Sequence, residues 1–595
     1  MLPKPALKYV NTLKSKAVMF KNILVFILFS ISTCFATTSG SLQYAYWNPL
    51  GNQLFDESMI LSSLNSAESS VTILLDQTEP ISFILHNSDD EDIKVQSISV
   101  INSRKADNID YDFRVVKNWY MGSRISVSVT KQGLQNPKLT PELLLKNDNL
   151  IFVDIKTEKS YVQIMESGVE SYQDISSPTA LMPNGAVLND TSDLQSFIIK
   201  AQNGKQIWLN VKTNLLTAPK QYNLQIKIDY TSGKHKHVLL VPLIFEVLPI
   251  VLSDGRLNHS IYYSGQLRSA NRLLSTPKTE AQYIAELKDL KSHGVLYPTQ
   301  YLSADNESTV GKYIQIRNQL GFPCDKMYFF GGFGDAHLRP LSKLESNIQI
   351  LKHIAVTNTN CKNSQIYLYG IDEAGGTQLV AESQDWKTVT ASGAYIFAAS
   401  FKGDLSENKM LSNLQTLVYL PLNSAMVQDK IEMRKLGKDV YLYGQPQTGI
   451  ANPFIYRKNY GYYLIKNDYT GAMPFAYQFG FPEHQRKGDL SDGLCFSSKT
   501  GYCSIWNNFD DSIYYDHMFT YPTTNGVIDT VQWEGYAAAI TDTRYYYTLV
   551  DLMKTRCTLN DARCNFDPMS LIDVEDPAGT RQRIIDKIKL LISKN

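Results

Sequence analysis

Two different spacings of apolar residues follow each other along the chain. From about residue 38 to 249, short runs alternate apolar and polar positions and are interrupted by Gly, Asn, Asp and Pro. Along the run 224–230, for example, Gln225, Lys227 and Asp229 alternate with apolar residues. An alternation of period two is typical of strands that bury one face and expose the other. We therefore predict an N-terminal antiparallel β-sandwich of two sheets.

After Ser253, apolar runs of strand length are separated by amphipathic stretches. This order is typical of repeated β-α units around a parallel sheet. Thr279 is a suitable N-cap for one of the helices, and His293 with Gly294 is a suitable end. Eight runs are present, and eight strands can close a (β/α)8 TIM-type barrel. They span residues 261–263, 295–298, 327–330, 366–369, 395–399, 417–420, 440–443 and 472–477.

These patterns divide the 595 residues into four expected segments, because one compact core seldom holds so long a chain. We predict a signal peptide over 1–36, a β-sandwich domain over 37–252, a (β/α)8 catalytic barrel over 253–530 and a C-terminal helical segment over 531–595 that packs on the barrel. The last segment has helical patterns over 534–553 and 580–592.

The N-terminus has the order of a secretory signal. Lys21 precedes an apolar run over 23–31, and small residues follow as far as Ala36, after which we expect cleavage. The run is shorter than the about 20 residues of a membrane span, so we expect no stable span after cleavage. The predicted location is secreted or periplasmic. The alternative is a lipoprotein acylated at Cys34, although Thr33 fits that pattern poorly.

Without Cys34, six cysteines remain in an oxidising compartment, and disulfides are expected. Cys495 with Cys503, and Cys557 with Cys564, are close enough in sequence to close short loops. Cys324 and Cys361 each precede a predicted strand, so they can meet at one end of a parallel sheet. Zinc is the weaker alternative, because the sequence contains no C-x-x-C and no H-E-x-x-H. We expect no metal and no cofactor.

Charge and composition exclude some partners. Lys plus Arg and Asp plus Glu both total 58, so no overall field attracts nucleic acid or an anionic membrane. The 36 tyrosines combine flat apolar rings with hydroxyls, which suits β-rich packing and also ring-shaped polar ligands such as sugars.

Asp372 and Glu373 follow the predicted fourth strand in the segment Q-I-Y-L-Y-G-I-D-E-A-G-G. In a parallel β/α barrel, catalytic groups lie at the carboxyl ends of the strands. The neighbouring glycines allow a turn in which both carboxylates face one pocket. Glycoside hydrolysis needs a carboxyl group that stays protonated near neutral pH, and a second carboxylate close by raises its pKa. The structural alternative is that Asp372 caps a helix and Glu373 lies in its first turn.

Three segments together resemble glycoside hydrolase family 123. They are Y-G-I-D-E-A at 369–374, H-G-V-x-x-P-T at 293–299 and W-E-G-Y-x-x-x-I-x-D-x-R-Y at 533–545. The order of a β-sandwich, a barrel and a short C-terminal segment is also similar to that family, so the resemblance covers most of the mature chain.

The resemblance implies a retaining exo-β-N-acetylhexosaminidase that acts on terminal β-linked N-acetylgalactosamine. Glu373 would be the general acid/base, and Asp372 would orient the substrate 2-acetamido group, whose carbonyl oxygen is the nucleophile. The chain departs from the family pattern at Ala537 and Ala538, where related sequences tend to carry an Arg and an acidic residue. This departure puts the substrate, or activity itself, in question.

Further residues are candidates for substrate contact because they follow predicted strands or combine an aromatic ring with polar groups. Each also has a structural reading, such as packing below a loop or capping a helix. Asp510 and Asp511 lack the spacing of a calcium loop. The candidates are His293, Tyr297, Tyr443, Gln445, Tyr477, Gln478, Trp506, Asn507, Trp533 and Glu534.

Two alternatives stay open at this level. A glycosidase acting on sugars without an acetamido group would use Glu373 as acid/base and Glu534 or Asp511 as nucleophile. A non-catalytic glycan-binding envelope protein would keep the same scaffold without turnover. The oligomeric state, the role of the sandwich and the choice between galacto and gluco sugars are not predicted.

Overall fold

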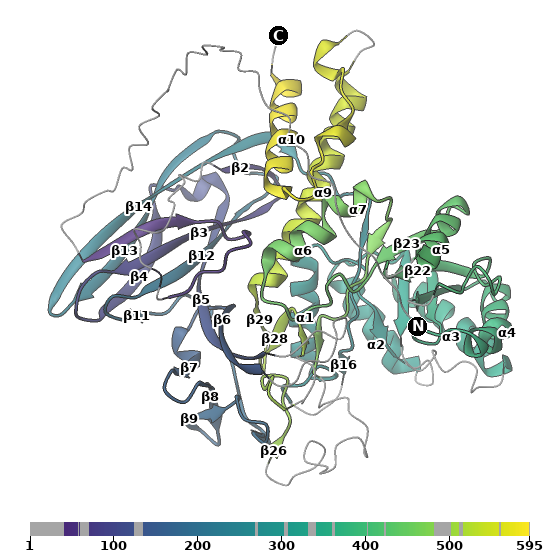
Figure 1. Ribbon diagram of the computed structural model, residues 1–595, viewed down its shortest axis with the longest axis horizontal. Coiled ribbons are helices and arrows are strands. Elements are labelled where there is room, and N and C mark those ends of the chain that lie inside the picture. The colour runs from purple at the N-terminus through teal and green to yellow at the C-terminus, as the bar shows by residue number, and fades with distance from the viewer. Residues whose placement is uncertain are drawn as a thin grey trace, which may run out of the picture. The chain divides into compact units, whose positions relative to one another are not determined.

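The structure is a computed structural model, and its described residues lie between 41 and 593 (Figure 1). The described ranges are 41–57, 59, 71–123, 135–267, 272–302, 307–330, 341–359, 363–400, 403–421, 424–480, 501–510, 516–557 and 561–593. The predicted signal peptide and Cys34 lie outside them. Within these ranges, no helix combines the length and the apolar character that crossing a membrane requires.

Two five-stranded sheets form the N-terminal part. The first has the order β1 (Leu42–Trp47), β3 (Thr78–Asn87), β12 (Gly204–Thr213), β5 (Ile109–Ser123), β6 (Gln135–Leu145) and is antiparallel throughout. The second has the order β11 (Phe197–Ile199), β4 (Ile93–Ile101), β13 (Gln221–Ser232), β14 (His235–Val251), β2 (Val71–Leu75), and its last pair is parallel. A smaller antiparallel sheet contains β7 (Ile151–Asp154), β8 (Lys159–Glu166) and β9 (Val169–Asp174).

Both five-stranded sheets contribute to one hydrophobic core. Phe83 of β3 and Leu209 of β12 belong to the same buried cluster as Ile226 of β13 and Val241 of β14. The alternation predicted over 224–230 is confirmed, because every second residue there is buried. The parallel pairing of β2 with β14 was not predicted, since a pairing direction leaves no mark on a single strand.

The C-terminal part is built on one eight-stranded parallel sheet, as the sequence predicts. Backbone N–H of Thr299 donates to the carbonyl of Ile261 at 3.0 Å, so the segments beside the two outermost strands also meet. The strand order is β15 (Asn258–His259), β24 (Gly471–Ala472), β23 (Asp439–Leu442), β22 (Leu414–Tyr419), β21 (Tyr395–Ser400), β20 (Gln365–Tyr369), β19 (Lys326–Phe330), β18 (Gln300–Tyr301).

Five predicted strands match β19 to β23 closely, and three do not. The first lies three residues earlier than predicted, the second lies after 295–298, and the last is limited to two residues. Pro298 and Pro474 have no N–H to donate, so neither can take a full place in a ladder. This explains why β18 begins after Pro298 and why β24 ends before Pro474.

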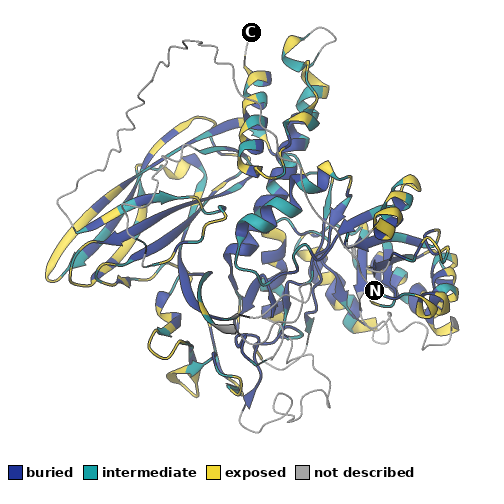
Figure 2. Cartoon of the chain, in the orientation of Figure 1, coloured by how far each residue is buried: buried dark blue, intermediate teal, exposed yellow. Residues whose placement is uncertain are grey.

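Helices return the chain between these strands, and Figure 2 shows exposed residues on their outer faces and buried residues in the strands. Thr279 and Gln282 form a capping box at the start of the first helix, and His293 caps its end, as predicted. The helices are α1 (Glu280–Ser292), α2 (Glu307–Gln319), α3 (Leu341–Thr359), α4 (Thr377–Ala391), α5 (Ser424–Lys435), α6 (Pro453–Tyr460) and α7 (Tyr462–Lys466).

Two long helices close the chain and confirm the helical patterns predicted there. They are α9 (Val531–Arg556) and α10 (Pro577–Ile592), which pack side by side (Figure 1). The remaining strands are short, and β10 of the N-terminal part pairs with β26 of the C-terminal part. They are β10 (Met182–Pro183), β16 (Gln266–Leu267), β17 (Pro277–Lys278), β25 (Gln478–Phe479), β26 (Gly501–Tyr502), β27 (His517–Met518), β28 (Thr520–Pro522) and β29 (Val527–Asp529).

One predicted disulfide is confirmed in full. Cys557 and Cys564 are bonded, with their Cα atoms 5.9 Å apart. Cys324 and Cys503 are also disulfide-bonded. Their predicted partners, Cys361 and Cys495, lie outside the described residues, so those two pairings stay predictions.

Candidate active site

Asp372 and Glu373 lie in the turn that follows β20 at its carboxyl end. The strand ends at Tyr369, and the next helix, α4, begins only at Thr377. Gly376 is the N-cap of that helix. The alternative in which Asp372 caps this helix and Glu373 lies in its first turn is therefore wrong, because the N-cap lies four residues beyond Asp372.

Each carboxylate accepts a hydrogen bond from a tyrosine of the parallel sheet. The hydroxyl of Tyr369 donates to Oδ1 of Asp372 at 2.6 Å. The hydroxyl of Tyr443, which follows β23, donates to Oε1 of Glu373 at 2.8 Å. Nε2 of Gln447 donates in turn to the Tyr443 hydroxyl at 3.3 Å. The structure thus brings the candidate Tyr443 to the candidate acid Glu373 from a strand 70 residues away.

Both carboxylates raise the pKa of one hydroxyl, that of Tyr443. Burial raises the pKa of Tyr443 well above its ordinary value, and the charges of Glu373 and then Asp372 raise it further. Burial also raises the pKa of Asp372, against the opposing effect of the Tyr369 hydrogen bond. Residue Asp372 is exposed, but neighbouring protein atoms still reduce the hydration of its carboxylate. Both carboxylates therefore lie close to the Tyr443 hydroxyl.

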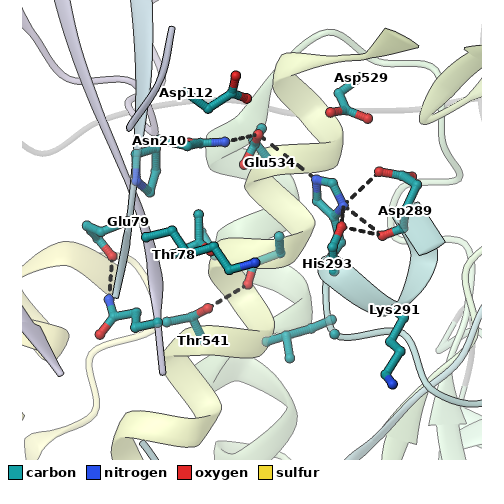
Figure 3. Close-up of a pocket in the computed structure, with 18 of the residues that line it drawn as sticks. Thr78, Glu79, Asp112, Asn210, Asp289, Lys291, His293, Asp529, Glu534 and Thr541 are labelled. Atoms are coloured by element: carbon teal, nitrogen blue, oxygen red, sulfur yellow. Dashed lines mark hydrogen bonds and ion pairs between the residues drawn. The ribbon is translucent and has the colours of Figure 1, made fainter. Parts of the chain in front are cut away.

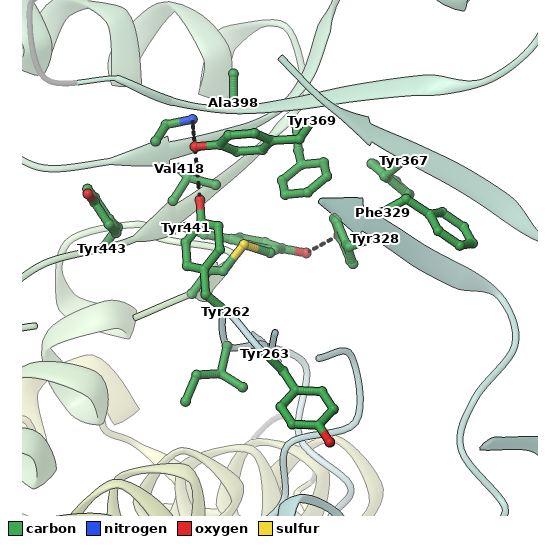
Figure 4. Close-up of a cluster of buried hydrophobic side chains, with 14 of the residues drawn as sticks. Tyr262, Tyr263, Tyr328, Phe329, Tyr367, Tyr369, Ala398, Val418, Tyr441 and Tyr443 are labelled. Carbon is green, nitrogen blue, oxygen red and sulfur yellow. Dashed lines mark hydrogen bonds between the residues drawn. The ribbon is translucent and has the colours of Figure 1, made fainter. Parts of the chain in front are cut away.

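Two further tyrosines lie at this place and were missed from the sequence. The hydroxyl of Tyr262 donates to that of Tyr369 at 3.3 Å, and Figure 4 shows the two pointing toward one another. Tyr262 also packs edge to face with Tyr443, with ring centroids 6.2 Å apart. Burial and the charge of Asp372 raise the pKa of Tyr301. Among 36 tyrosines, only the position of Tyr262 in a predicted strand could have singled it out.

Gln445 follows β23 on the same side as Tyr443 and is partly buried. Its backbone N–H donates to the hydroxyl of Tyr460 at 3.1 Å. Gln445 therefore lies beyond the carboxyl end of β23, where the sequence placed it. Within the described residues, no hydrogen bond joins its side chain to Asp372 or Glu373.

Within the described ranges, Tyr477 and Gln478 bond to groups other than the two carboxylates. The hydroxyl of Tyr477 donates to Asp289 on α1 at 2.7 Å. Gln478 accepts from Nζ of Lys278 at 2.7 Å and donates to Thr520 at 2.9 Å. Both side chains are buried and their polar groups are already bonded inside the protein. Tyr477 lies beyond β24, and Gln478 belongs to β25, which pairs with β27 and not with the parallel sheet.

Trp506 and Asn507 have no free surface for a sugar. Trp506 is 0% exposed, and its indole N–H donates to the carbonyl of Pro522 at 2.9 Å. Asn507 donates to the carbonyl of Ser177 at 2.9 Å. The indole belongs to the core of the two five-stranded sheets, so it packs there and cannot stack on a ligand.

Four other candidates lie at the opposite edge of the parallel sheet. A helix of a β-α unit returns the chain to the amino ends of the strands, and His293 caps the end of α1. Tyr297 donates to Asp325, which directly precedes β19, at 3.1 Å. The ring of Trp533 stacks on His293 with centroids 4.7 Å apart. Glu534 accepts from Asn210 of β12 at 2.8 Å.

A cavity of about 640 Å³ lies at this opposite edge and is lined by residues of β3, β5, β12, α1 and α9. Figure 3 shows His293 between Glu534 and Asp289 within it. Burial alone would lower the pKa of His293, but Asp289, with smaller effects of Asp529 and Glu534, raises it to about 10. Ala537 and Ala538, where the chain departs from the family pattern, line this cavity. The departure therefore lies away from Asp372 and Glu373.

Three residues that line this cavity, Asp289, His293 and Asp529, could together hold a metal ion. Donor atoms of Asp289, His293 and Asp529 lie within 4.8 Å of one another. Arg114, which pairs with Asp529, supplies positive charge there, and the raised pKa of His293 favours its charged form.

Asp372 and Glu373 do not line the cavity of about 640 Å³. The segments 303–306, 331–340 and 401–402, which follow β18, β19 and β21, lie outside the described ranges. Asp511 and residues 481–500 also lie outside them.

Comparisons with known proteins agree with this architecture. The chain is similar to a family 123 glycoside hydrolase from Clostridium perfringens, whose structure was reported for glycolipid glycan hydrolysis: 14% identity, a TM-score of 0.57, and 92% of this chain and 98% of that chain covered. A likeness to a β-glucuronidase 2 mutant from Bacteroides uniformis has 8% identity and a TM-score of 0.25, covering 80% of this chain and 48% of that chain. No protein-family model and no curated protein sequence matches the chain. The resemblance to family 123 is thus confirmed for the fold.

Proposed function

We propose that the chain is an exported retaining glycoside hydrolase, an exo-β-N-acetylhexosaminidase that prefers β-linked N-acetylgalactosamine. The observation that carries the proposal is that Asp372 and Glu373, at the carboxyl end of β20, accept hydrogen bonds from Tyr369 and Tyr443, two tyrosines that both pack against Tyr262. We also propose that the eight strands close as a (β/α)8 barrel behind an N-terminal β-sandwich. The Thr299 to Ile261 hydrogen bond supports closure.

In the proposed first step, the carbonyl oxygen of the substrate 2-acetamido group attacks the anomeric carbon. Glu373 gives its proton to the leaving oxygen as the glycosidic bond breaks. Asp372 accepts the acetamido N–H and stabilises the positive charge of the oxazoline-type intermediate. Because the sugar supplies the nucleophile, adjacent carboxylates suffice and no second carboxylate is needed across the ring.

In the second step, water attacks the anomeric carbon from the face that the aglycone left. Glu373 takes a proton from this water, and the bond to the acetamido oxygen breaks. Two inversions at one carbon give net retention. We place the partly buried Tyr301 beside the sugar, where its ring can supply the apolar face that a pyranose requires.

The two-carboxylate alternative finds less support. Glu534 lies at the opposite edge of the strands and is bonded to Asn210, so it cannot flank the same glycosidic bond as Glu373. Asp511 lies outside the described residues. As the natural substrate we propose a glycan that ends in β-linked N-acetylgalactosamine, and a glycolipid is one such source, as in the reported work on the Clostridium perfringens enzyme.

The test is hydrolysis of nitrophenyl β-glycosides of N-acetylgalactosamine, N-acetylglucosamine and galactose. We expect turnover of the first, less of the second and none of the third, with inhibition by a thiazoline analogue. Glu373→Gln should lower kcat by about 10²–10⁴-fold while sugar binding remains. Turnover of the galactoside would favour the two-carboxylate enzyme. Sugar binding without turnover in the unaltered protein would favour a glycan-binding protein.

A further inference from the structure

The turn from Gly370 to Gly376, which carries both candidate catalytic carboxylates, has an uncommon backbone shape. Glu373 has a φ of 50°, in the left-handed region that residues with side chains rarely adopt. Such a conformation costs free energy and persists only where the surrounding structure fixes it. The contacts that hold this turn therefore decide where Asp372 and Glu373 point.

A buried carboxylate of α4 holds the first end of the turn. Oε1 of Glu382 accepts a hydrogen bond of 2.5 Å from the backbone N–H of Ile371, and Glu382 is 1% exposed. A Cβ atom on Gly370 would lie 3.0 Å from the Trp386 ring and 3.1 Å from Oε1 of Glu382. The turn can approach α4 this closely because residue 370 is glycine.

A second carboxylate holds the other end. Oδ2 of Asp404, in the segment after β21, accepts from the backbone N–H of Gly376 at 2.7 Å. The next two residues of that segment donate their backbone N–H groups to the buried Asp429 of α5, at 3.3 and 3.0 Å. Asp404 is therefore fixed in place by a neighbouring helix before it bonds to the turn.

We propose that Glu382 and Asp404 are positioning residues, which clamp the two ends of the 370–376 turn so that Asp372 reaches Tyr369 and Glu373 reaches Tyr443. This inference rests on the function proposed above. Bonds from N–H groups to carboxylates are shorter and stronger than bonds between neutral groups. Neither residue is expected to touch the substrate, since each acts through the backbone of the turn.

Packing alone does not explain a carboxylate at position 382. Burying a carboxyl group costs hydration free energy that an apolar side chain would not lose. Oε2 of Glu382 is buried and has no hydrogen-bond partner within the described ranges, and burial raises the pKa of Glu382 to about 7. The bond to Ile371 and the interaction with the Trp386 indole, which both oppose this rise in pKa, offset part of that cost.

The test compares Glu382→Leu, Glu382→Gln and Asp404→Ala with the unaltered protein, using nitrophenyl β-N-acetylgalactosaminide. We expect Glu382→Leu and Asp404→Ala to lower kcat by about 100-fold with KM changed less than about threefold, because small misplacements of catalytic groups have effects of this size. Glu382→Gln keeps an accepting oxygen and should recover most of kcat. Glu142→Gln is the control, since Glu142 is equally buried, has a pKa raised to about 7 and lies in β6.

Hydrogen exchange of the peptide that contains residues 370–376 provides a second readout that does not need turnover. Exchange should be faster in Glu382→Leu and Asp404→Ala than in the unaltered protein and in Glu142→Gln. If the unaltered protein hydrolyses no glycoside, the proposed function fails while this readout still decides the positioning role. Unchanged exchange in both variants, or unchanged kcat in both with an active parent, would overturn the inference. If circular dichroism shows that Glu382→Leu is unfolded, Asp404→Ala and Glu382→Gln decide it.

Discussion

The Tyr443 hydroxyl donates to Glu373 at 2.8 Å, and the charge of Asp372 also raises the pKa of this hydroxyl. Tyr443→Phe removes this donor and leaves the ring in place. A hydrogen bond to a charged group contributes about 1.5–3 kcal/mol, so we expect kcat/KM to fall by about 10- to 100-fold. Tyr328→Phe is the matched control, because its hydroxyl bonds to Tyr441 at 2.9 Å within the same sheet. An equal loss in both variants would contradict a specific role for Tyr443.

At the same scale, the raised pKa of Asp372 makes the stability of the protein depend on pH. Burial raises its pKa above the ordinary 3.8, so the folded protein holds this proton more tightly than the unfolded chain does. The contribution of Asp372 to stability is therefore largest below that ordinary pKa and declines as the pH rises through the raised value. Asn keeps the oxygen that accepts from Tyr369 and carries no charge.

We therefore expect Asp372→Asn to abolish acetamido-assisted hydrolysis and to leave the protein at least as stable as its parent at neutral pH. Thermal melting from acidic to mildly alkaline pH measures this, and the difference in Tm should grow as the pH rises through the raised pKa of Asp372 and then stay constant. A variant that melts well below its parent at pH 8 would show that the carboxylate stabilises the fold.

At the scale of elements, the position of α9 against α6 depends on one glycine. A Cβ atom on Gly535 would lie 2.3 Å from the carbonyl oxygen of Pro453 and 2.5 Å from its Cα. These are backbone atoms, so the two helices would have to move apart. Gly→Ala within a helix ordinarily stabilises by about 0.5–1 kcal/mol, but here we expect destabilisation of about 1–3 kcal/mol.

Gly311→Ala in α2 is the control for that prediction. The nearest atom to its new Cβ would be 3.5 Å away, which is ordinary contact. Urea unfolding should therefore give opposite signs for the two substitutions, with Gly311→Ala the more stable protein. The same sign for both would mean that the contact with Pro453 relaxes freely.

At the scale of the whole molecule, a buried ion network joins the first sheet to the C-terminal helices. Arg581 of α10 bonds to Glu79 of β3 at 2.8 Å and to Asp542 of α9 at 2.5 Å, and Arg457 of α6 also pairs with Asp542. Arg581→Leu leaves the buried carboxylates of Glu79 and Asp542 with less positive charge beside them. We expect a loss of about 3–5 kcal/mol in the free energy of unfolding.

Denaturant unfolding measures this loss, and Lys554→Leu serves as the surface comparison. Lys554 lies 4.0 Å from Asp551 with both side chains exposed, so its removal should change stability by about 0–1 kcal/mol. Equal effects of the two substitutions would indicate that the buried network contributes nothing beyond a surface pair.

The sequence by itself determined the features that depend on near neighbours. Residue spacing alone predicted four of them. They are the alternation over 224–230, the helix cap at Thr279, the Cys557–Cys564 bond and the position of Asp372 and Glu373 after a strand. Periodicity, capping and short loops are local, so a single sequence carries their signal.

Only the tertiary structure decided which distant side chains share the site. Tyr443 lies at Glu373, whereas Trp506 is buried in another core and His293 lies at the far edge of the strands. One-residue differences in strand register and the return path of each helix set the face and the end at which a side chain lies. Those choices are settled by the packing of the whole chain, so an aromatic or polar residue looks the same in sequence whether it faces a ligand or the core.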